Sequence, residues 1–329
     1  MHRMSDDMAD FSRDYRVTYD VERKSCTITF RCFDTPNSVT AYVGDFADYE
    51  IENVLLDVRR LCLELHALWS FSLEESDIAR INAQTREPVP VDIRTARLLQ
   101  EMKAFHGREP LFDFTIGSAS FIWKHFDRVP DDRAVEEALS HVGVDKVSVA
   151  VACDEDGGEV PPFIQKSDSL TRVDVGGAAK GFAADLVAAR LREAGIKSAD
   201  VDLGGNLFLV GKHPAGRPWR LSVRIPEGIE ADRIVVEVED VSAVTSGSYE
   251  RFVEVGGKRY QHIVDPATGR PSTSDIVSAT VIAKSSLQAD MLATTLLMSG
   301  SGGYAGMLAR HPECDFIAIL QDGTVMRSS

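Results

Sequence analysis

Segments with helical periodicity alternate in this chain with pairs of short strands rather than with single strands. A steady strand–helix–strand rhythm would predict a doubly wound parallel sheet, and that rhythm is missing from the sequence. The pattern therefore predicts an α+β fold with mixed, largely antiparallel sheets and packed helices. Helices are expected at residues 48–69, 93–106, 133–141, 179–195 and 285–299. Strands are expected at residues 15–31, 146–152, 170–175, 199–203, 206–210, 219–224, 234–238, 251–255, 259–264 and 276–283.

The chain has 329 residues, enough for one large domain or two modest ones, and no linker or internal repeat divides it. We expect a flexible tail over residues 1–14 and a single domain over residues 15–329. Residues 108–120 are rich in turn formers and predict a loop. An Asp322-Gly323 turn predicts a hairpin near the end of the chain.

The formal net charge of −15 argues against nucleic acids and anionic membranes as partners. An anionic ligand could bind only where local cations or a metal ion overcome this field. No apolar run is long enough for a membrane span, and the polar N-terminus has no signal-peptide or lipid-anchor pattern. The five cysteines are scattered without a C-x-x-C pair, which favours reduced thiols and a cytoplasmic location.

The segment VDVGGAAKGFAAD, residues 173–185, places an acid, two glycines and a lysine before an apolar helix. Glycine permits a sharp turn and close approach of a ligand, and a helix N-terminus offers unpaired N–H groups to a phosphate. Lys180 lies in the first turn, where a phosphate needs a cation. The spacing matches neither a Walker A loop nor a dinucleotide-binding glycine motif. Taken alone, the segment is either a phosphate cradle or an ordinary strand-to-helix turn, and the ordinary turn is the more frequent.

Asp290 and Thr294 interrupt the otherwise apolar segment between Leu287 and Met298. Their spacing places both side chains on one helical face. A carboxylate in an apolar helix is costly unless it is paired or bound to a metal. A carboxylate with a hydroxyl is a hard-oxygen set suited to Mg²⁺. The alternative is that Asp290 bonds only its own helix start or the Thr294 hydroxyl.

His262 lies in KRYQHIVDPATGRP, at the end of an expected strand and just before an Asp265-Pro266 turn. A histidine in this setting can act as a general base. A hydrogen-bonded structural histidine is the commoner case, so both readings stay open.

The segment DVGGAAKGFAAD is one of several motifs that follow one another along the chain. The others are ESDIARINAQTREPVPV, LFDFTIG with Trp123, VDLGGN, TSGSYERF, GKRYQHIVDPATGRP and ADMLATTLL. In this order they resemble the motifs of the ApbE family, the FAD:protein FMN transferases. The segment DVGGAAKGFAAD matches the family pattern D-x-G-G-x-A-K-G-[YF]-A-x-D. The resemblance runs from about residue 30 to the C-terminus. It implies a single globular unit with the T-fold-like ApbE architecture.

The resemblance implies an enzyme that cleaves the pyrophosphate of FAD, attaches FMN through a phosphoester to a Thr or Ser of another protein, and releases AMP with the help of Mg²⁺. It implies catalytic roles for His262, as the base that activates the acceptor hydroxyl, and for Lys180. The implied metal ligands are the Gly177 carbonyl, Asp290 and Thr294. The implied contacts of FAD are Asp174, Lys180, Leu111, Phe112, Asp113, Thr268 and Phe33.

Two places depart from the family pattern around the flavin ring. Phe33 and Asp34 stand where the family often has Met-Gly, and Ser72 stands where it often has a tyrosine. The pyrophosphate and metal half of the site therefore looks intact, whereas the ring-binding half is altered. Two alternatives stay open: a Mg²⁺-dependent FAD pyrophosphatase that yields FMN and AMP, and a flavin-binding protein with impaired catalysis.

Acceptors of the family carry a D-x-x-[ST]-G-A-[ST]-like segment. The nearest string in this chain is DIVSAT at residues 275–280, which lacks the glycine and falls in an expected strand. We therefore expect FMN to be transferred to a separate, cytoplasmic acceptor protein.

Overall fold

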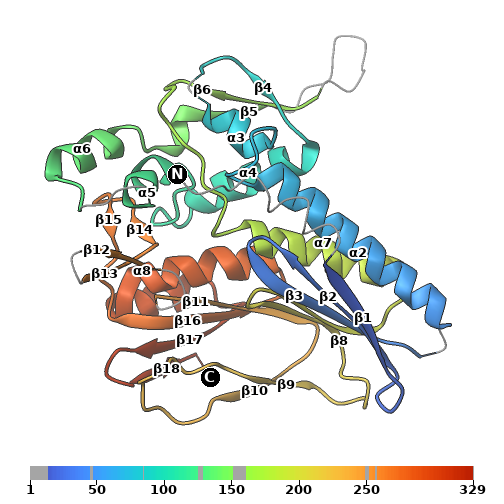
Figure 1. Ribbon diagram of the computed structural model, residues 1–329. Coiled ribbons are helices and arrows are strands. Elements are labelled where there is room, and N and C mark those ends of the chain that lie inside the picture. The colour runs from blue at the N-terminus through green and yellow to red at the C-terminus, as the bar shows by residue number, and fades with distance from the viewer. Residues whose placement is uncertain are drawn as a thin grey trace.

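The computed structural model describes residues 14–44, 47–83, 85–124, 129–150, 161–248, 252–255 and 258–328. The expected tail at residues 1–14 lies outside this part of the chain, apart from its last residue. The centre of the molecule is a nine-stranded sheet whose neighbouring strands are all antiparallel (Figure 1). The expected α+β class is confirmed.

The strands of this sheet come from both halves of the sequence. In spatial order they are β1 (Tyr15–Asp20), β2 (Ser25–Cys32), β3 (Thr35–Tyr42), β7 (Ser198–Leu203), β8 (Asn206–Gly211), β11 (Val241–Gly247), β16 (Ile276–Ala283), β17 (Asp315–Leu320) and β18 (Val325–Arg327). The closing hairpin turns at Gly323, which has a φ of 86°, as expected from the Asp-Gly pair. Strands β3 and β11 had not been expected.

Three long helices pack against one face of the sheet: α2 (Asp48–Trp69), α7 (Ala179–Glu193) and α8 (Ser286–Arg310) (Figure 1). Helix α2 buries a stripe that recurs every three or four residues, as its sequence predicts. The stripe consists of Ile51, Leu55, Val58, Cys62, Leu65 and Trp69. These side chains join the main apolar core, which holds α7 and α8 at the centre of the molecule.

The other face of the sheet carries a second, smaller core. Alternation along β17 sends Phe316 to the main core and Ile317 to the smaller one, as the two-residue period of a strand requires. The hairpin of β9 (Trp219–Ser222) and β10 (Val235–Val238) covers this face and contributes Leu221 and Val236.

The remaining elements form a lobe at one end of the long helices (Figure 1). Its helices are α3 (Asp77–Asn82), α4 (Ile93–His106), α5 (Gly117–Lys124) and α6 (Asp132–Ser140), with a short 3₁₀ turn at Val144–Lys146. Its strands are β4 (Val89–Pro90), β5 (Val147–Ala150), β6 (Phe163–Lys166), β12 (Phe252–Val255), β13 (Lys258–Gln261), β14 (Val264–Asp265) and β15 (Arg270–Pro271). Residues of α4, β5 and β6 join the main core, so this part of the lobe shares the interior of the sheet. Helices α5 and α6 and strand β14 enclose a separate, smaller apolar cluster, which consists of Ala119, Trp123, Val135, Ala138 and Val264.

Two local expectations are wrong. Residues 170–175 form no strand, and only Arg172 makes an isolated bridge, to Ile116. Helix α5 begins inside the expected loop, because Gly117 lets its first turn approach the Arg172 carbonyl closely. The helix expected at residues 285–299 is confirmed as the first part of α8, which is interrupted by a non-helical Gly300 (φ 66°). The second part had not been expected, and Asp275 caps its start by accepting from the Ser301 N–H at 2.8 Å.

Within the described residues, no helix has the length and apolar character needed to cross a membrane.

Candidate functional site

Helices α7 and α8 touch at Gly181, where only glycine fits. A Cβ atom on Gly181 would lie 2.5 Å from the Ser286 carbonyl oxygen and 2.8 Å from the Asp290 Cβ. This contact lets the Gly181 N–H donate to Asp290 Oδ2 at 2.9 Å. The first turn of α7 therefore lies directly against the face of α8 that carries Asp290.

Asp290 is a buried carboxylate, with 4% of its surface exposed. Burial raises the pKa of Asp290, while the positive charge of Lys180 and the Gly181 N–H act in the opposite direction. Thr294 lies one turn further along α8, with its Oγ1 3.4 Å from Ser246 Oγ. The neighbouring Thr295 points away, because its hydroxyl donates to the Met291 carbonyl at 2.8 Å.

Gly177 meets the same face of α8. A Cβ atom on Gly177 would lie 3.3 Å from Thr294 Oγ1 and 3.2 Å from Phe112 Cε2. The three residues expected to bind a cation therefore lie along one contact between the start of α7 and α8. Their role as metal ligands remains a prediction.

The turn that leads into α7 is built by Asp174. Its Oδ1 accepts from the Gly176 N–H at 2.9 Å, and its Oδ2 lies 3.4 Å from Ser120 Oγ. The chain just before it is clamped by the Asn82 side chain, which donates to the Val173 carbonyl at 2.9 Å and accepts from the Val173 N–H at 2.7 Å. The Asn82 side chain thus satisfies both backbone groups of Val173, as a neighbouring strand would. The turn is therefore fixed although residues 170–175 form no strand.

Lys180 reaches from α7 to the sheet, where its Nζ donates to the Gly204 carbonyl at 3.1 Å. Gly204 has a φ of 63°, and a Cβ there would lie 2.4 Å from Thr35 Oγ1. Lys180 is thereby held between Asp290 and the turn that joins β2 to β3.

Phe33 and Asp34 form that two-residue turn, with φ values of 52° and 58°. Residues other than glycine are rarely left-handed, and such strain is concentrated at functional sites. The Phe33 ring lies 6.5 Å from the Trp69 ring in a stacked arrangement and 5.9 Å from the His66 ring edge-on. Ser72 is exposed, and its hydroxyl lies 3.0 Å from Ser70 Oγ.

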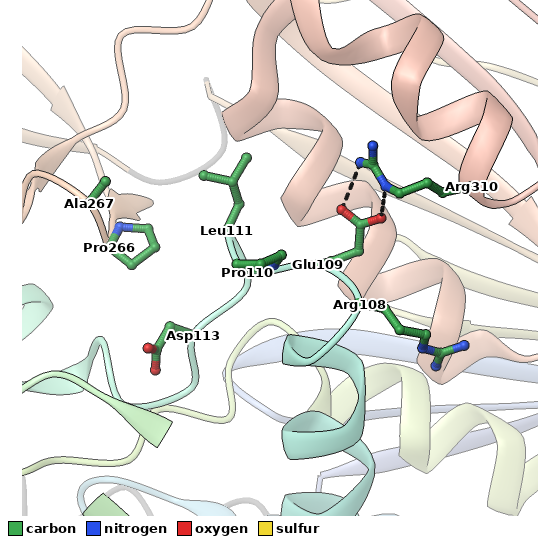
Figure 2. A pocket seen from close by; sticks show the side chains of 8 residues that line it. All are labelled: Arg108, Glu109, Pro110, Leu111, Asp113, Pro266, Ala267 and Arg310. Atoms are coloured by element: carbon green, nitrogen blue, oxygen red, sulfur yellow. Dashed lines mark hydrogen bonds and ion pairs between the residues drawn. The ribbon is translucent and has the colours of Figure 1, made fainter. Parts of the chain in front are cut away.

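A cavity of about 530 Å³ opens beside the loop that connects α4 to α5 (Figure 2). Its lining consists of Arg108, Glu109, Pro110, Leu111, Asp113, Pro266, Ala267 and Arg310. The cavity thus joins Leu111 and Asp113 to the turn that carries the exposed Thr268. Phe112 points the other way, into the core, where it packs edge-on against Phe105. The residues expected to contact FAD therefore converge on one loop and one facing turn, apart from Phe33 and the two residues near α7.

A buried ion cluster holds this loop against the end of α8. Glu109, 3% exposed, accepts from Arg310 at 2.6 and 2.9 Å (Figure 2). It also lies 2.8 Å from His311 Nε2. Burial opposes the charged form of Glu109, but these partners prevail and hold the pKa of its carboxyl below the usual value.

His262 is half-buried in the short segment between β13 and β14. Its neighbour Ile263 packs against the main core, and the Ile263 carbonyl accepts from the Ser272 N–H at 2.9 Å. The segment is therefore fixed at its base. The role of His262 as a base remains a prediction.

The donor atoms between α7 and α8 fit a hard divalent cation. They combine one carboxylate, one hydroxyl and the carbonyl of a turn, which are the oxygen donors that Mg²⁺ prefers. Nearby, the Asn206 Nδ2 is buried and makes no hydrogen bond among the described residues, as is found where polar groups serve a site. In the described part of the chain, no three His, Cys, Asp or Glu side chains form a metal cluster.

Several residues at this site were not singled out from the sequence. Asp185 is the last residue of the DVGGAAKGFAAD motif and Asn206 the last residue of VDLGGN, so these motifs could have identified both residues. Glu109 and Arg310 are 201 residues apart, and nothing in the sequence pairs them.

Curated proteins similar to this chain are named FAD:protein FMN transferases. The chain is 34% identical over 294 residues to the FAD:protein FMN transferase of Treponema pallidum, covering 85% of this chain and 80% of that one. It is 31% identical over 252 residues to the FAD:protein FMN transferase of Vibrio cholerae, covering 74% and 72%.

Solved structures give the same result. The flavin transferase ApbE from Vibrio cholerae superposes with a TM-score of 0.80 at 26% identity, covering 93% of this chain and 97% of that one. The ApbE protein from Thermotoga maritima superposes with a TM-score of 0.78 at 26% identity, covering 96% and 97%. The fold is thus that of the ApbE proteins. The chain belongs to the ApbE family, whose model matches residues 33–318.

Proposed function

We propose that this protein is a Mg²⁺-dependent FAD:protein FMN transferase. The observation that carries the proposal is the meeting of Gly177, Asp290 and Thr294 beside Lys180, at the N-terminus of α7. The relatives named above supply the class of reaction. A hard-oxygen set beside a lysine and a helix N-terminus suits a pyrophosphate, which needs its charge neutralised.

Each group has a task in this reaction. Asp290, Thr294 and the Gly177 carbonyl would hold Mg²⁺, which when bound supplies Lewis-acid neutralisation of the pyrophosphate. Lys180 and the first N–H groups of α7 bind the phosphate oxygens. The loop of Leu111 and Asp113 and the turn of Thr268 hold the rest of FAD.

His262 is the general base in this proposal. It accepts the proton of a Thr or Ser hydroxyl as that oxygen bonds to the phosphorus of the FMN half. The bond between this phosphorus and the bridging oxygen breaks, and AMP leaves with the electron pair. The products are a flavinylated protein and AMP.

The acceptor hydroxyl belongs to another protein. Ser278 and Thr280, the hydroxyls of the DIVSAT string, are 1% and 2% exposed within β16. Transfer to either would require the central sheet to open. We propose a cytoplasmic acceptor with a D-x-x-[ST]-G-A-[ST]-like segment.

Intact-mass spectrometry of such an acceptor domain, after incubation with the protein, FAD and Mg²⁺, tests the proposal. A gain of one FMN moiety that is lost with EDTA or in Asp290→Asn supports it. Release of AMP without a mass gain would instead indicate a FAD pyrophosphatase. Flavin binding with neither product would indicate a carrier, and either result overturns the transferase.

A further inference from the structure

Asn206 begins β8 and is completely buried. It contacts Ser286, which lies one helical turn before Asp290 on α8. The Asn206 Oδ1 accepts from Ser286 Oγ at 2.5 Å, which fixes the orientation of the amide. The Nδ2 donor is therefore on the opposite side and finds no acceptor in hydrogen-bonding geometry among the described residues. A buried donor without an acceptor is destabilising, so its presence calls for a role.

The carboxylate next to the Asn206–Ser286 contact is that of Asp290, one turn further along α8. The Asn206 side chain acts as a donor toward this carboxylate from β8, as the Gly181 N–H does from α7. The Gly181 N–H bonds one carboxylate oxygen, Oδ2, at 2.9 Å. Two donors from different elements thus act on a carboxylate that forms no ion pair within the described residues, which limits the directions in which its oxygens can face.

The orientation of Asn206 is itself fixed by a chain of hydrogen bonds from α7. Asp185 accepts from the Ser286 N–H at 2.7 Å, the Leu287 N–H at 3.0 Å and Ser285 Oγ at 2.8 Å. These bonds cap the start of α8 from outside the helix and locate Ser286. Ser242 Oγ adds a contact to Ser286 Oγ at 2.8 Å. The carboxylate of α8, the amide of β8 and the acid of α7 therefore form one connected polar unit.

We infer that Asn206 is a positioning residue that orients the Asp290 carboxylate toward a divalent cation, and that Asp185 and Ser286 hold Asn206 in that orientation. The inference rests on the proposed cation site. Residues that orient a metal ligand typically change metal affinity 10- to 100-fold when removed. Removing the amide is therefore expected to weaken cation binding by about tenfold or more while the fold is retained.

The test is the binding of Mn²⁺ to the full chain without FAD, followed by electron paramagnetic resonance, alongside thermal unfolding. Asn206→Ala and Asn206→Leu should each raise the Mn²⁺ dissociation constant by at least about tenfold. Thr295→Val is the matched control, because it removes a buried hydroxyl of α8 that points away from the site. It should lower thermal stability without changing Mn²⁺ binding.

A double-mutant cycle with Ser286→Ala separates positioning from general packing. If Ser286 acts through Asn206, the losses in Mn²⁺ affinity are not additive. Unchanged Mn²⁺ affinity in both folded Asn206 variants overturns the inference, as do additive losses or an equal loss in Thr295→Val. Asp290→Asn separates failure of the positioning role of Asn206 from failure of the proposed cation site. If Asp290→Asn leaves Mn²⁺ binding intact, the proposed cation site itself has failed.

Discussion

Gly177 and Gly181 are four residues apart, yet the structure gives them different tolerances for a methyl group. At Gly181 an added Cβ would meet a backbone carbonyl oxygen at 2.5 Å, whereas at Gly177 its closest neighbours are side chains at 3.2 and 3.3 Å. Gly181→Ala should therefore cost about 3 kcal/mol of unfolding free energy, because α7 and α8 must move apart. Gly177→Ala should cost under about 1 kcal/mol but narrow the space beside Thr294.

Urea denaturation of both variants measures the difference, and Mn²⁺ titration of the folded Gly177→Ala protein reports on the site. Equal losses of stability at the two positions would contradict the helix contact described here.

At the scale of elements, the ion cluster of Glu109, Arg310 and His311 fastens the cavity loop to the end of α8. The pKa of Glu109 is lowered in the folded state, so the folded protein holds this proton less firmly than the unfolded chain. Its contribution to stability is thus present above the unfolded pKa of about 4.3 and is lost as the pH falls through the folded value. Glu109→Gln should cost about 2 kcal/mol at pH 7, since Arg310 is half-exposed.

Denaturant midpoints from pH 7 to pH 3 test this, with Glu101→Gln as a control on an exposed acid of α4 outside the cluster. The difference between the parent protein and Glu109→Gln should shrink as the pH falls. A constant difference would show that Glu109 acts by packing alone.

Lys166 fastens another pair of elements, the end of α3 and the turn that precedes Asp174. It is 3% exposed, and its Nζ donates to the carbonyls of Ala83 at 3.0 Å, Ser169 at 3.3 Å and Thr171 at 3.0 Å. Burial lowers its pKa to about 8. Between this value and the unfolded pKa of about 10.4, the unfolded chain binds a proton that the folded protein has lost, so stability rises with pH.

Between pH 7 and pH 10 the parent protein should therefore gain about 2 kcal/mol relative to Lys166→Met. Urea midpoints of both proteins across this range measure the difference, in which the titration of all other groups cancels. A gain of the opposite sign would mean that the ammonium form is the one the fold prefers.

The sequence predicted an element well where the apolar spacing and flanking residues of that element alone determine its structure. Helices α2 and α4 and strand β16 have the expected bounds because their apolar periods and flanking residues are local. Strand β11 was missed because it is built largely from small and polar residues such as Ser242 and Ala243. These are buried only by tertiary packing, Ser242 against α8 and Ala243 in the smaller core on the other face of the sheet. The same distinction holds in the site. The spacing of Asp290 and Thr294 is local to one helix, whereas the pairing of Glu109 with Arg310 is created by the fold.

At the scale of the whole molecule, the main core runs through every layer. It contains Ile28 of β2, Leu99 of α4, Ile164 of β6 and Phe316 of β17, so the sheet and a large part of the lobe share one interior. Helices α5 and α6 and strand β14 add a smaller apolar cluster of their own. We therefore expect residues 15–329 to unfold as one domain, in a single calorimetric transition with equal calorimetric and van't Hoff enthalpies. Two resolved transitions, or protection of the sheet amides after the lobe amides exchange, would contradict a single domain.

The net charge of −15 makes a last prediction about how an anionic nucleotide reaches the site. The long-range field repels FAD, while the favourable groups, Lys180 and the start of α7, act at short range. Added salt shortens the Debye length from about 30 Å at 10 mM to about 8 Å at 150 mM, so it screens the repulsion more than the local contacts. The association rate constant of FAD, followed by stopped-flow flavin fluorescence at fixed free Mg²⁺, should therefore rise about threefold over this range. Uncharged riboflavin is the matched control, and its association rate should not change with salt. A rate for FAD that falls with salt would mean that the local cations, and not the acidic surface, govern the approach.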